Sequence, residues 1–333
     1  MRAIVHEQFG EPEDVLHVAD RSTPEPGPGQ VRVRTTLATI HNHDLWTVRG
    51  TYGFKPELPA ASGTEAVGVV DAVGEGVEAL AVGDRVIAGG IFGVWAEQFV
   101  ADAAALMPAP AGLPDEAAAQ LVAMPFSAIS LLEDLSLEPG QWIVQNAANG
   151  AVGRMVAQLA RARGVRVVGL VRRPEGVDEL RDAGIDDIVA TSEDGWADRI
   201  RTITGGSPIV AGVDSVGGSS AGDVLSVLAE GGTLVAFGAM GSPTLELSSG
   251  DLIFKQATVR GFWGSVVSRQ MAPALKQRLF AELSERIGDG GRRLRGDLGH
   301  ADLRGRPDQR LGDGAGLVQQ QCGDVSGGLH GAA

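Results

Sequence analysis

The chain's clearest chemical feature is a run of small residues between Asn146 and Gly153. The apolar run from Trp142 to Gln145 precedes it, and helical spacing of apolar residues resumes after it. This pattern predicts a buried strand, a tight turn and a helix whose N-terminus points back at the turn. Such a turn could bind a pyrophosphate, because small side chains let phosphates approach the backbone and the helix N-terminus stabilises negative charge. Alanine replaces the first glycine of the usual pattern, so an ordinary strand, turn and helix without a ligand is the alternative.

Two arginines follow the next predicted strand. Residues 165–171 form a second apolar run, and Arg172 and Arg173 come directly after it, nineteen residues beyond Gly153. A site for NAD normally has an acidic residue here for the ribose 2′-hydroxyl, whereas arginine binds a 2′-phosphate through charge-assisted hydrogen bonds. The pair therefore predicts NADPH as the cofactor. The alternative is that both arginines are solvated loop residues.

Tyr52 is the only tyrosine of the chain and a candidate proton donor. Glycines flank it and Pro56 lies downstream, which predicts a loop. A phenol in a loop can face a cleft. The alternative is a tyrosine that packs at the edge of its domain.

The composition limits the classes of function. A chain of 333 residues is long enough for two domains. The net charge of −14 argues against nucleic acid as a main partner, and no apolar run is long enough for a membrane span. Cys322 is the only cysteine, so no intrachain disulfide is expected. Residues 1–5 enter an apparent strand without a signal segment, which predicts a cytoplasmic protein.

Two patterns of elements must position these residues. Up to about Leu113, short β runs alternate with turns, which predicts a β-barrel-like domain with strands at residues 3–5, 15–18, 31–39, 66–73, 85–88 and 95–100. Residues 116–135 are predicted to be helical with a break near Pro125. Strands and helices then alternate to about Phe262, as a doubly wound parallel sheet requires. The expected elements there include strands at 209–214, 233–238 and 258–261, a helix at 221–229, and afterwards a return helix at 271–287. The fold class is therefore α/β.

The end of the chain differs in composition. Residues 289–333 contain twelve glycines, several arginines, no aromatic residue and no sustained hydrophobic period. Such a segment buries too little apolar surface to offset its ordering entropy. We expect an atypical Gly/Arg-rich tail that is disordered, and its composition resembles GC-rich coding sequence read out of frame.

Several motifs, in order and at matching spacing, resemble the medium-chain dehydrogenase/reductase superfamily. The zinc-independent, quinone oxidoreductase-like branch is most similar, and within it the trans-2-enoyl thioester reductases. The matching segments are residues 50–60, 145–153, 216–220, 231–240, 252–255 and 260–263. This resemblance implies a GroES-like β-barrel catalytic domain and a Rossmann domain. The expected boundaries are 1–120 for the catalytic domain, 121–262 for the NADPH-binding domain, 263–288 for a return segment to the catalytic domain, and 289–333 for the tail.

Zinc-dependent members of the superfamily have a metal-binding cysteine in one loop and a His-Glu pair at a later glycine turn. Here the two regions read His-Asn-His-Asp at 41–44 and Gly-Thr-Glu at 63–65. His41 and His43 would face opposite sides if they lay on a strand. A tetrahedral site therefore has too few ligands, and we expect no metal.

The resemblance implies reduction of the C=C bond of a 2-enoyl thioester. Hydride adds to the β-carbon, and a tyrosine at the position of Tyr52 stabilises the enolate or protonates the α-carbon. Pyrophosphate and 2′-phosphate contacts are expected from Asn149, Gly150, Ala151, Val152, Arg172 and Arg173. The nicotinamide side, where the acyl chain enters, is expected to include Phe237, Gly238, Ala239, Met240, Phe262, Trp263 and Gly264. The three aromatic residues among these could instead be core residues, as aromatics usually are.

Two other functions stay open. NADPH:quinone reduction shares the fold and the cofactor turn, and a catalytically weak NADPH-binding or sensing protein is the second alternative. The expected partner is a small molecule, either a 2-enoyl thioester or a quinone, with no nucleic acid and no membrane. The resemblance alone implies a homodimer. The residues do not distinguish coenzyme A from acyl carrier protein as the acyl carrier.

Overall fold

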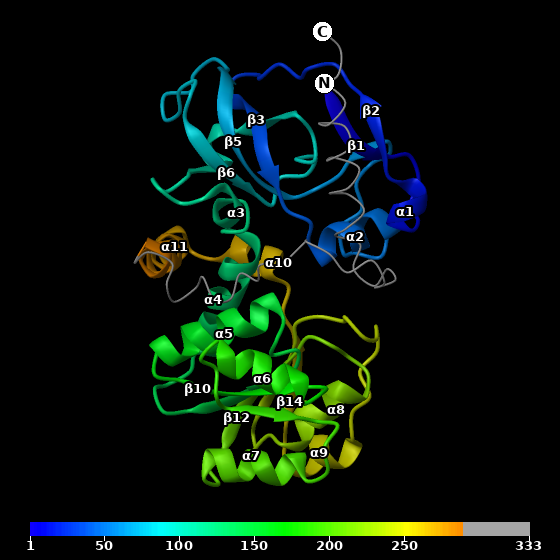
Figure 1. Cartoon of the computed structure of the whole chain (residues 1–333), viewed down its shortest axis with the longest axis vertical. Coiled ribbons are helices and arrows are strands. Elements are labelled where there is room, and N and C mark those ends of the chain that lie inside the picture. Colours follow the sequence, from blue (N-terminus) through cyan, green and yellow to red (C-terminus); the bar gives the residue numbers. More distant parts are fainter. Residues whose placement is uncertain (289–333) are drawn as a thin grey trace. The chain divides into compact units, whose positions relative to one another are not determined.

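The computed structural model describes residues 1–288, so the expected disordered or out-of-frame tail at 289–333 lies outside the described residues. The described chain forms two compact units, one from Met1 to Ala123 and one that begins at Met124 (Figure 1). Each unit has its own hydrophobic core. The two are described separately below.

The first unit is built from antiparallel strands, as the short turn-separated β runs predicted. Five strands form one sheet in the order β7-β3-β5-β6-β8 and three form another in the order β2-β1-β4. On β3, Val31 and Val33 are fully buried while Arg32 and Arg34 alternate with them, which is the period of a strand with one face on the core. The strands are β1 (Arg2–His6), β2 (His17–Asp20), β3 (Gln30–Ala38), β4 (Ala60–Ala61), β5 (Glu65–Val73), β6 (Arg85–Gly89), β7 (Gln98–Asp102) and β8 (Leu106–Pro108).

Short helices connect these strands, and two expected strands differ in the structure. Residues 15–18 divide between the end of a helix and the start of β2, because Pro12 occupies the first turn of that helix. The strand expected at 95–100 begins only at Gln98, after the buried Trp95. The helical segments of this unit are α1 (Pro12–Val15), α2 (Asn42–Arg49), η1 (Ala103–Ala105) and α3 (Asp115–Ala118).

The second unit is a doubly wound α/β domain, as the alternating elements predicted. Its six strands are all parallel in the order β11-β10-β9-β12-β13-β14. Strands β10 and β11 are added on one side of β9 and β12 to β14 on the other, so the topological switch point lies between β9 and β12. Adjacent residues of β9 point to opposite faces of the sheet. Ile143 packs in a cluster with residues of α4 and α5, and Val144 packs in a cluster with residues of α7 and α8. The strands are β9 (Trp142–Gln145), β10 (Arg166–Val171), β11 (Ile188–Ala190), β12 (Ile209–Asp214), β13 (Thr233–Ala236) and β14 (Thr258–Gly261).

Helices lie on both sides of this sheet in Figure 1, with α5 on one side and α7 on the other. In residues 1–288, no helix is both long and apolar enough to cross a bilayer. The helices are α4 (Ala123–Leu135), α5 (Ala151–Ala162), α6 (Glu175–Asp182), α7 (Trp196–Thr204), α8 (Ser219–Ser226), α9 (Ser249–Phe254), α10 (Gly264–Gln270) and α11 (Pro273–Gly288).

The helix expected at 116–135 is interrupted earlier than Pro125. The first piece, α3, ends at Ala118, and α4 begins at Ala123. Pro125 therefore lies in the first turn of α4, where its missing N–H costs no helical hydrogen bond. The proline therefore does not break the helix.

The segment 263–288 differs from the expected return to the first domain. Helix α11 packs in the core of the second unit, where the Phe280 ring stacks on Phe126 with centroids 4.3 Å apart. Leu279 and Leu283 of the same helix are buried. Within the described residues, α10 and α11 thus complete the nucleotide-type domain.

We predict that Gly169→Ala on β10 destabilises the protein by about 1–3 kcal/mol, because the core has no room for a methyl group there. A Cβ at this glycine would lie 2.5 Å from Cδ1 of Ile188 and 2.7 Å from Cβ of Ala148. Urea unfolding followed by circular dichroism measures the change. Gly261→Ala on β14 is the matched control, since a Cβ there meets nothing within 4 Å. Equal unfolding midpoints for the two variants would contradict the packing argument.

Candidate functional site

The turn after β9 has the conformation that a phosphate-binding loop needs. Ala147 adopts a left-handed φ of 48°, and Gly150 is the N-cap of α5. A Cβ at Gly153 would lie 2.7 Å from the Ala147 carbonyl oxygen, so only glycine lets the helix start this close to the turn. Asn149 and Gly150 are exposed, and the first turn of α5 contains no acidic residue. The open backbone and the helix N-terminus fit a bound pyrophosphate.

Two side chains that sequence reasoning missed hold this turn. The Gln145 amide donates a hydrogen bond of 2.7 Å to the Gly153 carbonyl. The Arg154 Nε donates to the Asn149 carbonyl at 3.0 Å, and its guanidinium also pairs with Glu179 of α6. Because these partners lie in the loop and on a neighbouring helix, the turn is fixed by the protein itself. Arg154 is nine-tenths buried, so its role is to stabilise the conformation of the turn.

Arg172 and Arg173 lie where the sequence predicted, directly after β10. Both are exposed, and neither forms an ion pair with any residue of the described chain. Strand β10 pairs with β9, with Gly169 opposite Gln145, so the arginines leave the same edge of the sheet as the phosphate turn. Two exposed guanidinium groups at this place suit a phosphate monoester.

A buried hydrogen-bond network lies at the switch point between β9 and β12. The Asn146 amide donates to the Asp214 carboxylate at 2.5 Å and to the Ser220 hydroxyl at 3.2 Å. Asp214 is fully buried and also accepts backbone N–H groups from Val216 and Gly217, each at 3.1 Å. The network fixes two loops beside the crevice in which doubly wound sheets bind ligands.

Two further predicted segments lie at this edge of the sheet. Residues 237–240 follow β13, and residues 262–264 follow β14. The rings of Phe237 and Phe262 stack with centroids 5.6 Å apart, and Phe262 is buried in the core. Met240 and Trp263 are 52% and 40% exposed. Phe262 is thus a core residue, whereas Met240 and Trp263 expose part of their side chains to solvent.

Tyr52 belongs to the first unit, in the loop that follows α2. Gly50 ends the helix in a left-handed conformation with φ of 72°, and the Tyr52 N–H then donates to the Trp46 carbonyl at 3.1 Å. The loop therefore folds back on α2. The Tyr52 ring is half-buried and lies against the His43 ring, with centroids 5.8 Å apart.

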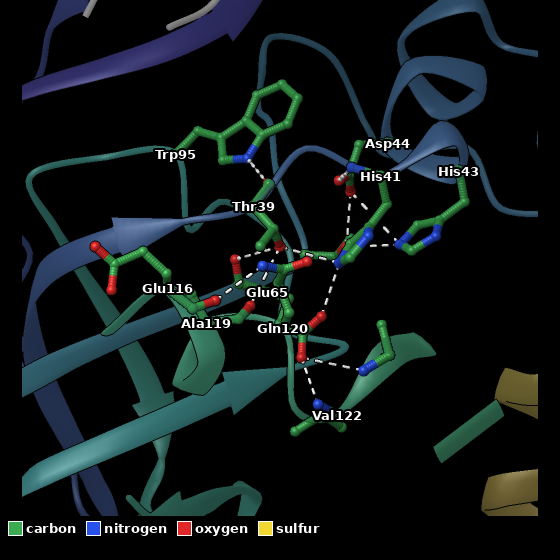
Figure 2. A network of polar contacts seen from close by, with 12 residues as sticks. Thr39, His41, His43, Asp44, Glu65, Trp95, Glu116, Ala119, Gln120 and Val122 are labelled. Atoms are coloured by element: carbon green, nitrogen blue, oxygen red, sulfur yellow. Dashed lines mark hydrogen bonds and ion pairs between the residues drawn. The ribbon is translucent and has the colours of Figure 1, made fainter. Parts of the chain in front are cut away.

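The expectation that His41 and His43 face opposite sides is wrong. They lie at the start of a helix and not on a strand, and their rings stack with centroids 5.0 Å apart. The His41 Nε2 lies 2.7 Å from an oxygen of the fully buried Glu65, whose other oxygen accepts N–H groups of Val122 and Ala123 (Figure 2). The periodicity of a strand did not apply to this short polar run.

His43 has different partners. Its Nε2 lies 2.7 Å from the Thr64 hydroxyl, which donates to Asp44 at 2.7 Å. Burial lowers the pKa of His43; the Asp44 charge opposes this shift and His41 adds to it. The ring is therefore neutral near pH 7. Across residues 1–288, no group of three or more histidine, cysteine or acidic side chains is arranged to hold a metal ion.

Comparisons with known proteins agree with this architecture. A family model described as zinc-binding dehydrogenase matches residues 151–280, and one described as alcohol dehydrogenase GroES-like domain matches residues 27–111. The mouse mitochondrial enoyl-[acyl-carrier-protein] reductase is 35% identical over 297 residues, which cover 87% of this chain and 79% of the relative.

Solved structures show the same fold. The Escherichia coli quinone oxidoreductase complexed with NADPH has a TM-score of 0.77 and 26% identity, and the match covers 87% of this chain and 89% of that chain. The mitochondrial 2-enoyl thioester reductase of Candida tropicalis has a TM-score of 0.75 at 24% identity, over 87% of this chain and 88% of that chain. The chain therefore belongs to the zinc-independent medium-chain dehydrogenase/reductase superfamily of oxidoreductases, close to the enoyl thioester reductases.

Proposed function

We propose that the protein reduces the C=C bond of a 2-enoyl thioester with NADPH. The observation that carries the proposal is the half-buried Tyr52 in a loop that is folded back on α2, in a chain 35% identical to an enoyl reductase over most of its length. A phenol held in this way can act on charge that develops at a thioester carbonyl.

The second unit supplies the residues that would hold the cofactor. The open backbone of the turn at 149–152 suits the pyrophosphate, and Arg172 and Arg173 suit the 2′-phosphate. Trp263 and Met240 offer exposed surface at the same sheet edge. When bound, NADPH supplies a hydride for the β-carbon of the alkene.

The first unit supplies the proton donor. As electron density moves to the carbonyl oxygen of the substrate, the Tyr52 hydroxyl donates a hydrogen bond to that oxygen or gives its proton to the α-carbon. A positioned acid of this kind contributes about 10²- to 10⁴-fold to a rate. Solvent then returns the proton to the phenol.

Reduction of a quinone by NADPH is the second candidate. The observation that favours it is the match to a quinone oxidoreductase at a TM-score of 0.77 and 26% identity. Assays with crotonyl-CoA and with a quinone, each followed by NADPH oxidation, separate the candidates. NADPH binding without turnover of either would indicate a sensing protein.

We predict that Tyr52→Phe lowers the rate of crotonyl-CoA reduction by at least about 100-fold and leaves NADPH binding intact. The reason is that the substitution removes only the hydroxyl. Steady-state kinetics and NADPH fluorescence titration measure the two effects. Glu57→Gln, an exposed change in the same loop, serves as the control. Unchanged turnover in Tyr52→Phe would falsify the role of the phenol.

We predict that the double variant Arg172→Ala, Arg173→Ala weakens NADPH binding by roughly 10- to 100-fold and leaves NADH binding nearly unchanged, because only NADPH carries the 2′-phosphate. Titration with both nucleotides measures the preference. Arg181→Ala removes an exposed arginine from α6 and is the control for lost positive charge. An equal loss of affinity for both nucleotides would show that the pair does not read the 2′-phosphate.

A cytoplasmic location stays a prediction from the sequence.

We further propose that the protein forms a homodimer through the second unit. Strand β14 is an edge of the six-stranded sheet, and apolar side chains are exposed on it and on α9. Val259 is 36% exposed, Ile253 60% and Phe254 83%. Exposed apolar side chains beside an open strand edge are typical of a protein interface.

We predict that Phe254→Glu combined with Val259→Lys converts the dimer to a monomer, because charges would be buried without partners at the interface. Light scattering after size-exclusion chromatography measures the mass. Val82→Glu, at an exposed residue of the first unit, is the control. A wild-type monomer, or a double variant that stays dimeric, contradicts the proposed interface.

A further inference from the structure

Three aromatic rings of the first unit, those of His41, His43 and Tyr52, form a column. The His41 and His43 rings are nearly parallel, with an interplanar angle of 20° and centroids 5.0 Å apart. The Tyr52 ring continues the column at 5.8 Å from His43, tilted by 31°. The phenol ring of Tyr52 therefore lies against the His43 ring.

The inner end of the column is anchored to a buried carboxylate. Glu65 is fully buried, and one of its carboxylate oxygens lies 2.7 Å from the His41 Nε2. Its other oxygen accepts backbone N–H groups of Val122 and Ala123 at 2.5 and 3.0 Å (Figure 2). Charge-assisted hydrogen bonds that are fully buried are short and strong, so His41 has little freedom to move.

The middle ring is fixed independently. The Thr64 hydroxyl donates to Asp44 Oδ1, so its oxygen accepts from the His43 Nε2–H. The other oxygen of Asp44 accepts the His41 N–H at 2.8 Å. These bonds place the proton of neutral His43 on Nε2 and fix the plane of the ring. Among residues 1–288, the charged and titratable groups around it are Asp44 of α2 and His41 just before that helix, with Glu65 beyond His41 and Tyr52 on the outer side.

We propose that His43 is a positioning residue for Tyr52: its imidazole, held by Thr64 and supported by His41, sets the orientation of the phenol toward the substrate. This inference rests on the proposed function, because it assigns an effect through Tyr52. His43 itself touches neither substrate nor cofactor in this scheme. Loss of the ring leaves Tyr52 in its loop but removes the contact that sets the angle of the phenol, and misplacement of about 1 Å at a reacting group costs up to roughly 100-fold in rate.

Two variants separate the ring from the hydrogen bond. His43→Gln keeps a donor for Thr64 but removes the ring, and His43→Phe keeps a ring but removes the donor. We expect His43→Gln to lower kcat by roughly 10- to 100-fold with KM for NADPH unchanged, and His43→Phe to recover most of that loss. In the Tyr52→Phe background, His43→Gln should have no further effect. His17→Gln, at an exposed histidine of the same unit, is the control.

A spectroscopic measurement tests the same inference without turnover. Tyr52 is the only tyrosine among 333 residues, so selective isotope labelling gives a single ring signal by NMR. We expect His43→Gln to move that signal toward the position of free tyrosine, because the neighbouring aromatic ring is lost, and His43→Phe to leave it displaced. The His17→Gln signal should match the wild type.

The outcomes distinguish this inference from the proposed function. If Tyr52→Phe leaves crotonyl-CoA reduction unchanged, the proposed function fails and this inference fails with it. If Tyr52→Phe slows reduction but His43→Gln changes neither kcat nor the tyrosine signal, only the positioning role is overturned. An equal rate loss in His43→Gln and His43→Phe, with the tyrosine signal unmoved, also overturns it.

Discussion

The first unit depends on the buried carboxylate of Glu65. A fully buried charge is stable only when its oxygens are paired and hydrogen-bonded, and removal of one partner from such a group typically costs about 3–5 kcal/mol. Glu65 begins β5, His41 precedes α2, and Val122 and Ala123 lie at the end of the unit. One side chain thus joins three segments that are far apart in the sequence. The ring column starts from this junction, because His41 is its innermost ring.

The second unit uses the same physical device at a different place. Asp214 is also fully buried, and it also accepts backbone N–H groups, here from Val216 and Gly217. Its neutral partner is the Asn146 amide, which belongs to the phosphate turn. In both units, a buried carboxylate thus joins backbone N–H groups of one segment to a side chain of another, His41 in the first unit and Asn146 in the second. Preorganisation by such bonds lets a loop present polar groups without losing order.

Local patterns predicted the elements best where one period dominated. The strands expected at 209–214 and 258–261 match β12 and β14, because apolar runs bounded by turn residues are short and unambiguous. The helix expected at 221–229 lies instead at 219–226, since Gly218 with φ of 58° allows an earlier start. The packing of segment 263–288 was predicted less well. Its hydrophobic period indicates a helix with an apolar face, but it does not show which of the two units that face packs on.

The site residues could be predicted where the signal lies in a short stretch of sequence. The turn at 146–153 and the two arginines after β10 are where their spacing predicted. The contacts of Glu65 were not predictable, since its partners lie 24 and 57 residues away. His41 and His43 show a second limit: a two-residue spacing indicates opposite faces only if the run is a strand, and here a helix begins within it.

The arginines of the second unit show why an acidic chain can still bind an anion. Arg163 pairs with Glu133 of α4 and Glu282 of α11, at 3.2 and 2.8 Å. Burial alone would raise the pKa of Glu282, but the hydrogen bond and charge of Arg163 lower it below its ordinary value, so the pair stays charged and fastens α11. The Arg154 guanidinium is likewise paired with a carboxylate, that of Glu179.

Arg172 and Arg173 differ from these arginines because they have no ion-pair partner within residues 1–288 and lie in solvent. Electrostatic interactions between exposed charges are screened beyond about 10 Å, so the net charge of −14 has little effect on a phosphate in direct contact with two guanidinium groups. Whether an arginine is already paired with a carboxylate, and not the overall charge of the chain, therefore decides where an anion can bind.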